Sequence, residues 1–194
     1  MKIVLIGGKA NSGKDSTAEY IDKYYREKGL DVVNIQIAYY IKMYAKQIAM
    51  WDGDNETKPR QLLQDLGTEL IRKQIDEYFF IKRILQDIDV YSRYFDVITI
   101  SDGRLPEEFR EIKKVYPETI SLHVTRPGYV SHLTKDQKAH LTETLVDEIE
   151  YDYDIVNDGT LEDLEQKAIK FCKAIDKVEK YNRKVEKRKV VKES

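Results

Sequence analysis

The sequence predicts an α/β protein in which helices cover both faces of a five-stranded parallel sheet, giving three layers. Two patterns carry this prediction. Short apolar or β-branched runs recur at 3–6, 31–37, 96–101, 119–125 and 153–156, and segments with helical spacing of apolar residues lie between them. Strands that alternate with helices are typical of parallel sheets, because each crossover returns the chain to the same end of the sheet.

The predicted helices lie at 14–28, 38–50, 60–73, 77–94, 106–116 and 141–149, and a last helix begins at Thr160. Thr160 and Asp163 form an acidic variant of a capping box at its start. Residues 176–194 are rich in Lys and Arg but interleaved with Glu, which favours a solvated segment over a nucleic-acid patch. We therefore expect one domain over residues 1–175 and a basic C-terminal helix or tail over 176–194.

Length and composition exclude several classes of protein. The 194 residues suffice for a core, and a net charge of −2 gives no reason to expect nucleic acid or membrane binding. Cys172 is the single cysteine, and its place on an apolar-periodic helix favours a buried thiol over a nucleophile. No apolar run reaches the roughly 20 residues that span a bilayer, and Met1 leads directly into the first strand without a signal peptide. We expect a soluble, cytoplasmic protein.

A loop with the spacing G-x-x-x-x-G-K follows the first strand and precedes the first helix. In this context backbone N–H groups, the positive end of the helix and the lysine side chain converge on an anion, and glycines permit the close approach. An ordinary strand-to-helix turn is the alternative. The sequence predicts that nucleotide phosphates bind at Gly8, Lys9, Ala10, Asn11, Ser12, Gly13, Lys14, Asp15, Ser16 and Thr17.

The hydroxyl that usually follows the lysine of such loops is displaced by one position. Asp15 stands directly after Lys14, and Ser16 comes next. This order is similar to the G-K-G-T arrangement of nucleoside monophosphate kinases. Ser16 is therefore the hydroxyl expected to contact magnesium, with Thr17 as the alternate.

Three further segments follow predicted strands and should meet the loop at the carboxyl edge of the sheet, where ligands bind in such folds. They are 38–42, 102–104 and Arg126. Asp102 ends a buried strand, where a carboxylate can hold magnesium and its waters, although it could instead cap the next helix.

Arg104 should point into the same cleft. A guanidinium suits a phosphate dianion because it donates two parallel hydrogen bonds. The alternative is a surface arginine paired with Glu107 or Glu108.

Polar side chains repeat along one face of the helix expected at 60–73. Gln61, Gln64 and Thr68 share this face, and Arg72 follows four residues after Thr68. Such a face can bind a nucleoside and its phosphate, and it can equally be a solvated face. Gly67 weakens the helix, which indicates close approach by another group.

The segment 126–140 has no clear period and begins with Arg126. A basic loop after a strand suits a lid that closes over phosphates and excludes water. The spacing of its histidines forms no metal-ligand set, so His140 is interpreted as a hydrogen-bonding lid residue.

Seven segments, in chain order, resemble the phage and bacterial deoxynucleoside monophosphate kinase family, which has the nucleoside monophosphate kinase fold of P-loop NTPases. They cover about residues 1–170 and read GKANSGKDS, IAYYIKMYAKQ, RQLLQDLGTELIR, ISDGRLPEEFREI, VTRPG, AHLTET and YDIVNDGTLEDL. The combination of Leu-Gly-Thr-Glu-x-x-Arg with Ser-Asp-x-Arg points to this family within the P-loop kinases.

The resemblance implies transfer of the γ-phosphate of ATP to a deoxynucleoside monophosphate, giving ADP and the diphosphate. It implies that the loop 8–16 binds ATP, that Ser16 and Asp102 serve Mg²⁺, and that nucleotides are the partners. The residues that it assigns to catalysis are Lys14, Asp102, Arg104 and Arg126. Those that it assigns to the acceptor are Lys42, Gln64, Thr68, Glu69, Arg72 and Arg104.

The chain departs from the usual family motif Ser-Asp-Val-Arg-Phe-Pro-Asn-Glu at Gly103, Leu105 and Glu107. Two alternatives therefore stay open: a P-loop kinase for another phosphorylated small molecule, such as phosphomevalonate or dephospho-coenzyme A, and a nucleotide-binding regulator without efficient transfer. The tyrosine-rich stretches 20–25 and 39–44 fit the core, the acceptor pocket or the face of a homodimer equally well.

Overall fold

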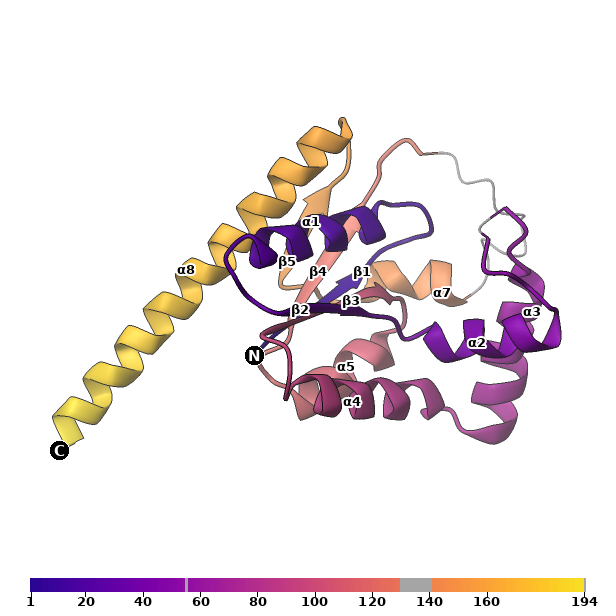
Figure 1. The fold of residues 1–194 in the computed structure, drawn as a ribbon, viewed down its shortest axis with the longest axis horizontal. Helices are drawn as coiled ribbons and strands as arrows, with labels where there is room; N and C mark the ends of the chain where they lie inside the picture. The colour runs from indigo at the N-terminus through magenta and orange to yellow at the C-terminus, as the bar shows by residue number, and fades with distance from the viewer. Residues whose placement is uncertain (55, 130–140, 194) are drawn as a thin grey trace.

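The computed structural model describes residues 1–54, 56–129 and 141–193, and its strands form one parallel sheet in the order β2-β3-β1-β4-β5 (Figure 1). The strands are β1 (Lys2–Gly7), β2 (Val32–Ile35), β3 (Val97–Gly103), β4 (Ile120–Thr125) and β5 (Tyr153–Val156). The predicted five-stranded parallel fold is confirmed, with strand ends within two residues of expectation.

The helices follow the predicted order, with two differences in type. The helix expected at 60–73 is α3 followed by a π-helix, η1, and the one expected at 141–149 is α7 followed by a short 3₁₀-helix, η2. Their bounds are α1 (Lys14–Arg26), α2 (Tyr39–Ile48), α3 (Arg60–Gln64), η1 (Asp65–Ile75), α4 (Phe79–Tyr91), α5 (Pro106–Val115), α7 (Leu141–Thr144), η2 (Leu145–Glu148) and α8 (Leu161–Glu193).

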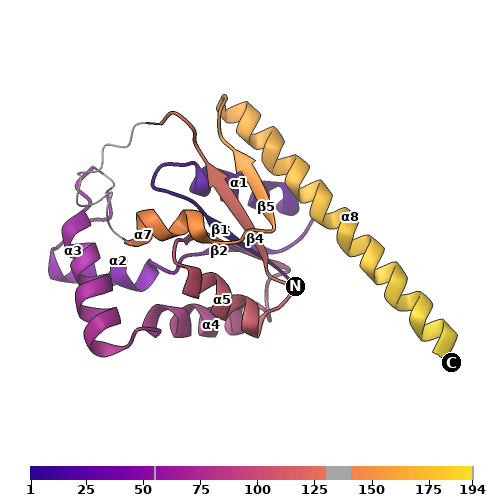
Figure 2. The ribbon, with the colours of Figure 1, turned by 180° about the vertical axis from the view of Figure 1, so that it is seen from behind.

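The central strand β1 divides the core into two halves because its side chains alternate between the faces of the sheet. Ile3 and Leu5 join a cluster with α2, η1, α4 and α5, whereas Val4 and Ile6 join a cluster with α1 and α8. The two groups of helices accordingly lie on opposite sides of the sheet in both views (Figures 1 and 2). This burial on both faces accounts for the continuous apolar run from Ile3 to Ile6.

The last helix, α8, packs on the sheet only through its first half and then leaves the body of the protein (Figure 2). Among the side chains described as far as Tyr181, the last buried ones are Cys172 and Ile175, and Val178 and Tyr181 are exposed. Burial raises the pKa of the Cys172 thiol to about 12, as expected of a structural thiol. The predicted capping box forms, since Thr160 N and Asp163 N each donate to the other residue's side chain.

The tyrosine-rich stretches serve mainly as packing. Tyr25 is buried in the core beneath α8, and Tyr40 and Tyr44 pack against the other cluster. Tyr39 is exposed. In the described part of the chain, no helix is both long and apolar enough to cross a membrane.

The chain reverses its winding direction at β1. It passes from β1 to β2 and β3 on one side, then returns to β4 and β5 on the other. In parallel sheets such a switch point opens a crevice beyond the strand carboxyl ends, because the two connections leave in opposite directions. The glycine-bracketed loop lies at this point.

Candidate functional site

The loop 8–13 turns tightly at the end of β1. Gly8 and Gly13 have φ of 146° and 103°, and Asn11 also has positive φ. A Cβ atom on Gly8 would lie 2.3 Å from the carbonyl oxygen of Val124, and one on Gly13 would lie 2.6 Å from Asn157 Nδ2. Side chains at these glycines would therefore collide with β4 and with the turn after β5, so the spacing of the motif has a steric cause.

Lys14 lies at the first turn of α1 with its side chain only 6% exposed. Its ammonium donates to the carbonyl oxygen of Lys9, at 2.7 Å. Burial and the nearby Arg104 guanidinium lower the pKa of Lys14 to about 7. A buried cation beside another cation is stabilised by a bound anion, so the arrangement fits a phosphate.

The three residues after Lys14 point in different directions. Asp15 lines a cavity, and Ser16 does not line either of the two cavities found at this edge. Thr17 is fully buried, and its hydroxyl donates to the carbonyl oxygen of Gly13 at 2.8 Å. The carboxylate of Asp15, rather than the displaced hydroxyl, thus reaches the cleft.

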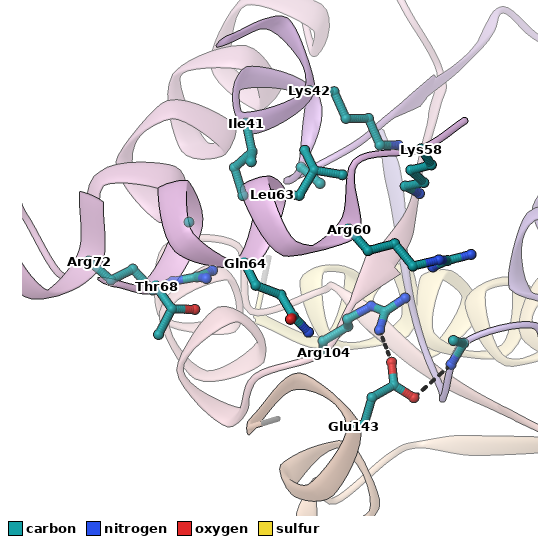
Figure 3. A pocket seen from close by; sticks show the side chains of 13 residues that line it. Ile41, Lys42, Lys58, Arg60, Leu63, Gln64, Thr68, Arg72, Arg104 and Glu143 are labelled. Carbon is teal, nitrogen blue, oxygen red and sulfur yellow. Dashed lines mark hydrogen bonds and ion pairs between the residues drawn. The ribbon is translucent and has the colours of Figure 1, made fainter. Parts of the chain in front are cut away.

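Two adjoining cavities open at the carboxyl edge of the sheet. We call the first, of about 350 Å³, the loop cavity, because Ala10, Asn11, Lys14 and Asp15 form one wall. The second, of about 170 Å³, is the helix cavity, lined by α2, α3 and η1 (Figure 3). Five basic side chains line both cavities: Lys42, Lys58, Arg60, Arg72 and Arg104.

Lys58 and Arg60 come from the loop before α3 and its first residue, and sequence reasoning did not assign them to the site. Both line the same cavity as Arg104 (Figure 3). Burial and the charges of Lys42, Arg60 and Arg104 lower the pKa of Lys58 to about 8. Neither Lys58 nor Arg60 forms an ion pair with any described residue, so this part of the cleft favours an anionic ligand.

The side chain of Arg72 is held in place by the buried carboxylate of Glu108. Its Nη2 donates to Glu108 Oε1 at 2.9 Å, and its guanidinium lies over the Phe80 ring. Glu108 Oε2 also accepts the backbone N–H groups of Arg104 and Leu105, which completes the N-terminal cap of α5. Burial raises the pKa of Glu108, and Arg72 opposes that rise. One acidic residue thus holds the Arg72 guanidinium and the backbone of Arg104, whose own guanidinium pairs with Glu143 instead.

Asp102 lies at the end of β3 and lines the loop cavity. Its two carboxylate oxygens accept the N–H groups of Ile37 and Ala38, at 2.8 and 2.9 Å. The side chain therefore ties the start of α2 to the sheet and does not cap α5. Each oxygen keeps a second lone pair that can face the cavity.

The polar face expected on the 60–73 helix is present only in part. Gln64, Thr68 and Arg72 line the helix cavity (Figure 3). Glu69 is exposed and pairs with Lys73, and it lines neither cavity. Gln61 also is exposed and donates to Asp65.

The close approach indicated by Gly67 is a packing contact. A Cβ atom there would lie 3.0 Å from Cδ1 of Ile41 on α2. The glycine thus lets the π-helix approach α2, and both contribute to the wall of the helix cavity. π-Helical segments occur frequently at functional sites.

Arg126 does not line either cavity. It is exposed, and its guanidinium lies over the ring of Tyr129, whose hydroxyl accepts a hydrogen bond from Asn11 of the loop. The rest of the predicted lid, 130–140 with His140, lies outside the described residues. The lid interpretation stays a prediction.

Glu143 on α7 is a site residue that sequence reasoning did not single out. Its side chain lines the helix cavity, forms an ion pair with Arg104, and accepts the backbone N–H of Ala10 at 3.0 Å (Figure 3). The only signal in the sequence was its place in the segment AHLTET. A carboxylate that bridges the Ala10 N–H and Arg104 has no local sequence pattern that would reveal it.

The parallel sheet, with a glycine-bracketed lysine loop at its switch point, is that of the P-loop kinase class. Solved structures agree on the fold. APS kinase of Mycobacterium tuberculosis has 13% sequence identity and a TM-score of 0.51, covering 87% of this chain and 94% of its own. A gluconokinase from Sinorhizobium meliloti has 11% identity and a TM-score of 0.55, covering 93% and 97%. At such identities the likeness shows the fold alone.

Within that class, the family model for deoxynucleotide monophosphate kinase matches residues 31–168. The chain therefore belongs to the deoxynucleotide monophosphate kinase family. The deoxynucleotide monophosphate kinase of Enterobacteria phage T4 is 31% identical over 112 residues, which are 57% of this chain and 44% of that protein. The enzyme of Escherichia phage RB69 is 31% identical over 115 residues, covering 59% and 44%. The matches span less than half the length of these relatives.

Proposed function

We propose that the protein transfers the γ-phosphoryl group of ATP to the phosphate of a deoxynucleoside monophosphate, producing ADP and the diphosphate. The observation that carries this proposal is the convergence of five basic side chains on two adjoining cavities beside the loop. A nucleotide-binding protein needs one phosphate site, whereas phosphoryl transfer needs two that share cationic groups. The names of the curated relatives supply the class of acceptor.

The loop cavity fits the phosphates of ATP. The positive φ angles of Gly8 and Gly13 turn the loop into a backbone cradle that a Cβ atom would fill. The buried Lys14 ammonium has a lowered pKa and, among the described residues, only a backbone carbonyl as its hydrogen-bond partner, so an arriving phosphate would restore its charge. The Ser12 hydroxyl, buried in the same loop, has no partner among the described residues.

Magnesium would be held at the same place by Asp15 and Asp102, which line the loop cavity. The third carboxylate of its lining, Glu108, is already engaged by Arg72 and by backbone N–H groups at the start of α5. The described residues form no group of three acidic, histidine or cysteine side chains that could hold a metal alone. The remaining ligands would thus be phosphate oxygens and water, as Mg²⁺ prefers. When bound, the ion neutralises charge on the phosphates. Ser16 lies off the cavities, so we assign it no ligand role.

The helix cavity would hold the acceptor. Arg72, held by Glu108, and Arg104, held by Glu143, line both cavities, and a monophosphate bound between them would face the loop. Lys42 and Lys58 add charge from the opposite side (Figure 3). Gln64 and Thr68 line the same cavity, where they could donate and accept hydrogen bonds with a nucleoside.

The chemistry assigned to the chain is positioning and charge neutralisation. Lys14 and Arg104 would stabilise the negative charge that spreads over the equatorial oxygens in the transition state. Arg72 and Lys58 would hold the acceptor phosphate in line with the bond that breaks. The attacking oxygen is already ionised at neutral pH, so no general base is required.

An ADP-release assay with ATP and Mg²⁺ tests this proposal. The acceptors are the four deoxynucleoside monophosphates, the four ribonucleoside monophosphates, phosphomevalonate and dephospho-coenzyme A. We expect turnover with at least one deoxynucleoside monophosphate, and weaker turnover with the two non-nucleotide acceptors. Measurable ATP binding without turnover of any deoxynucleoside monophosphate would contradict the proposal and favour a regulator.

A further inference from the structure

Glu143 stands at the meeting point of the two phosphate-binding walls. One carboxylate oxygen accepts the N–H of Ala10 in the loop, and the other pairs with Nη1 of Arg104 (Figure 3). The side chain is about 10% exposed. Its charge also raises the pKa of Lys14, against the lowering effect of burial. Glu143 thus contacts the Ala10 N–H and the Arg104 guanidinium, and its charge acts on the Lys14 ammonium.

A carboxylate and a phosphoryl group use the same kinds of hydrogen-bond donor. Backbone N–H groups of a glycine-bracketed loop and an arginine guanidinium are typical partners of a phosphate, and both bind carboxylates as well. Ala10 has one backbone N–H to give. A phosphate oxygen that takes it must displace Glu143, and a dianion beside the retained carboxylate would be repelled.

We propose that Glu143 is an internal substitute for the substrate phosphate, which occupies the Ala10 N–H and Arg104 until a phosphorylated ligand displaces it. The carboxylate holds Arg104 in the cleft of the ligand-free protein. A weakly binding anion must compete with this carboxylate for the same hydrogen-bond donors. Glu143 is a positioning residue, and it raises the Kd of the cleft for anions. The inference rests on the proposed function only in taking the cleft as a phosphate site.

The neighbouring Asp147 provides a matched control. It lies on η2, four residues after Glu143, and pairs with the ammonium of Lys9 in the same loop. Substitution of Asp147 by Asn removes one negative charge, as Glu143→Gln does, at a position four residues away in the sequence. It leaves the Ala10 N–H and Arg104 contacts in place, so it reports the loss of a nearby carboxylate, and the release of Lys9, without freeing those two donors.

Isothermal titration with sodium tripolyphosphate, without nucleotide or metal, tests the proposal in the full chain. We expect Glu143→Gln to lower the Kd for tripolyphosphate at least tenfold, and Asp147→Asn to lower it less than twofold. Because a merely structural lesion would weaken binding, tighter binding distinguishes displacement from damage. An unchanged or higher Kd in Glu143→Gln, or an equal gain in Asp147→Asn, would overturn the proposal.

Glu143→Ala provides a second variant if the glutamine variant does not give a cooperative thermal transition. It removes every acceptor atom, so the same tightening is expected. The measurement requires no turnover. Failure of the kinase assay therefore leaves this prediction standing, and failure of the titration leaves the kinase proposal standing.

Discussion

The two walls of the cleft are built in different ways. The loop wall, residues 8–17, is one contiguous stretch whose shape follows from the backbone of two glycines and the start of a helix. The helix wall combines α2, the residues before α3, η1 and the end of β3, which are far apart in the chain. A phosphate nest is a local structure, whereas an acceptor pocket exists only once the layers have packed. The predictions below test this division.

The largest effect is expected at the loop wall. Lys14→Met should lower kcat about a thousandfold, because it removes the cation closest to the transferred group. The same change should raise the Tm of the ligand-free protein. The pKa of Lys14 in the folded state, about 7, lies below its value in the unfolded chain, so its charged form costs stability at pH 7 and below, and this cost fades as pH rises.

Thermal unfolding at pH 6 and pH 9 measures the second effect. The gain in Tm of Lys14→Met over the native sequence should be larger at pH 6. A fall in Tm at pH 6 would contradict the assignment of Lys14 as a strained functional cation.

A smaller effect, mainly on the acceptor, is expected at the helix wall. Arg72→Ala should raise the KM for the deoxynucleoside monophosphate about a hundredfold and change the KM for ATP little, because Arg72 would grip the acceptor phosphate. Steady-state kinetics with each substrate varied in turn measures this. Arg83→Ala is the matched control, since Arg83 also stacks on an aromatic ring, that of Tyr40, but is exposed and lines neither cavity.

Lys58 should show a dependence on pH that the arginines lack. Its pKa of about 8 means that the ligand-free side chain loses its charge above that pH, so the acceptor KM should rise between pH 8 and 9.5 at saturating ATP. Lys58→Met should raise KM about tenfold at pH 7. Lys58→Arg stays charged over this range and should remove the rise. A pH profile of Lys58→Arg identical to the native one would assign the titration to another group.

The smallest effect is expected at Gly67. Its φ is not in the left-handed region, and the added Cβ of Gly67→Ala would crowd the flexible end of Ile41 and reach Nη1 of Arg72 only at an ordinary contact distance of 4.0 Å. A gain in helix propensity of about 1 kcal/mol opposes that contact. The Tm and kcat/KM should therefore change little. Gly13→Ala, with φ of 103° and Asn157 in the way, should lower the Tm and weaken ATP binding clearly.

Equal effects of the two glycine substitutions would remove the distinction between the walls. The loop would then tolerate a Cβ as the helix wall does, and its conformation could not be ascribed to the glycines.

Interpretation of the sequence was most reliable where a pattern is local. The apolar runs that became β1 and β3, the loop with its lysine, and the cap of Thr160 and Asp163 each involve residues within a few positions of one another. The positions of Arg72 and Arg104 were also expected, because residues after strands and along a polar helix face are placed by simple periodicity. Glu69 was expected near the nucleoside but faces away from both cavities and pairs with Lys73.

The sequence by itself determined the parallel sheet, the loop and the chemical character of the cleft, since alternating strands and helices bring their ends to one edge. Only the tertiary structure decided which charges meet there. Lys58 precedes a short helix and Glu143 follows the segment after β4, and no periodicity links either to the loop. Long-range packing set the distances of Lys58 and Glu143 from the loop, and the electrostatics of the site depend on these distances.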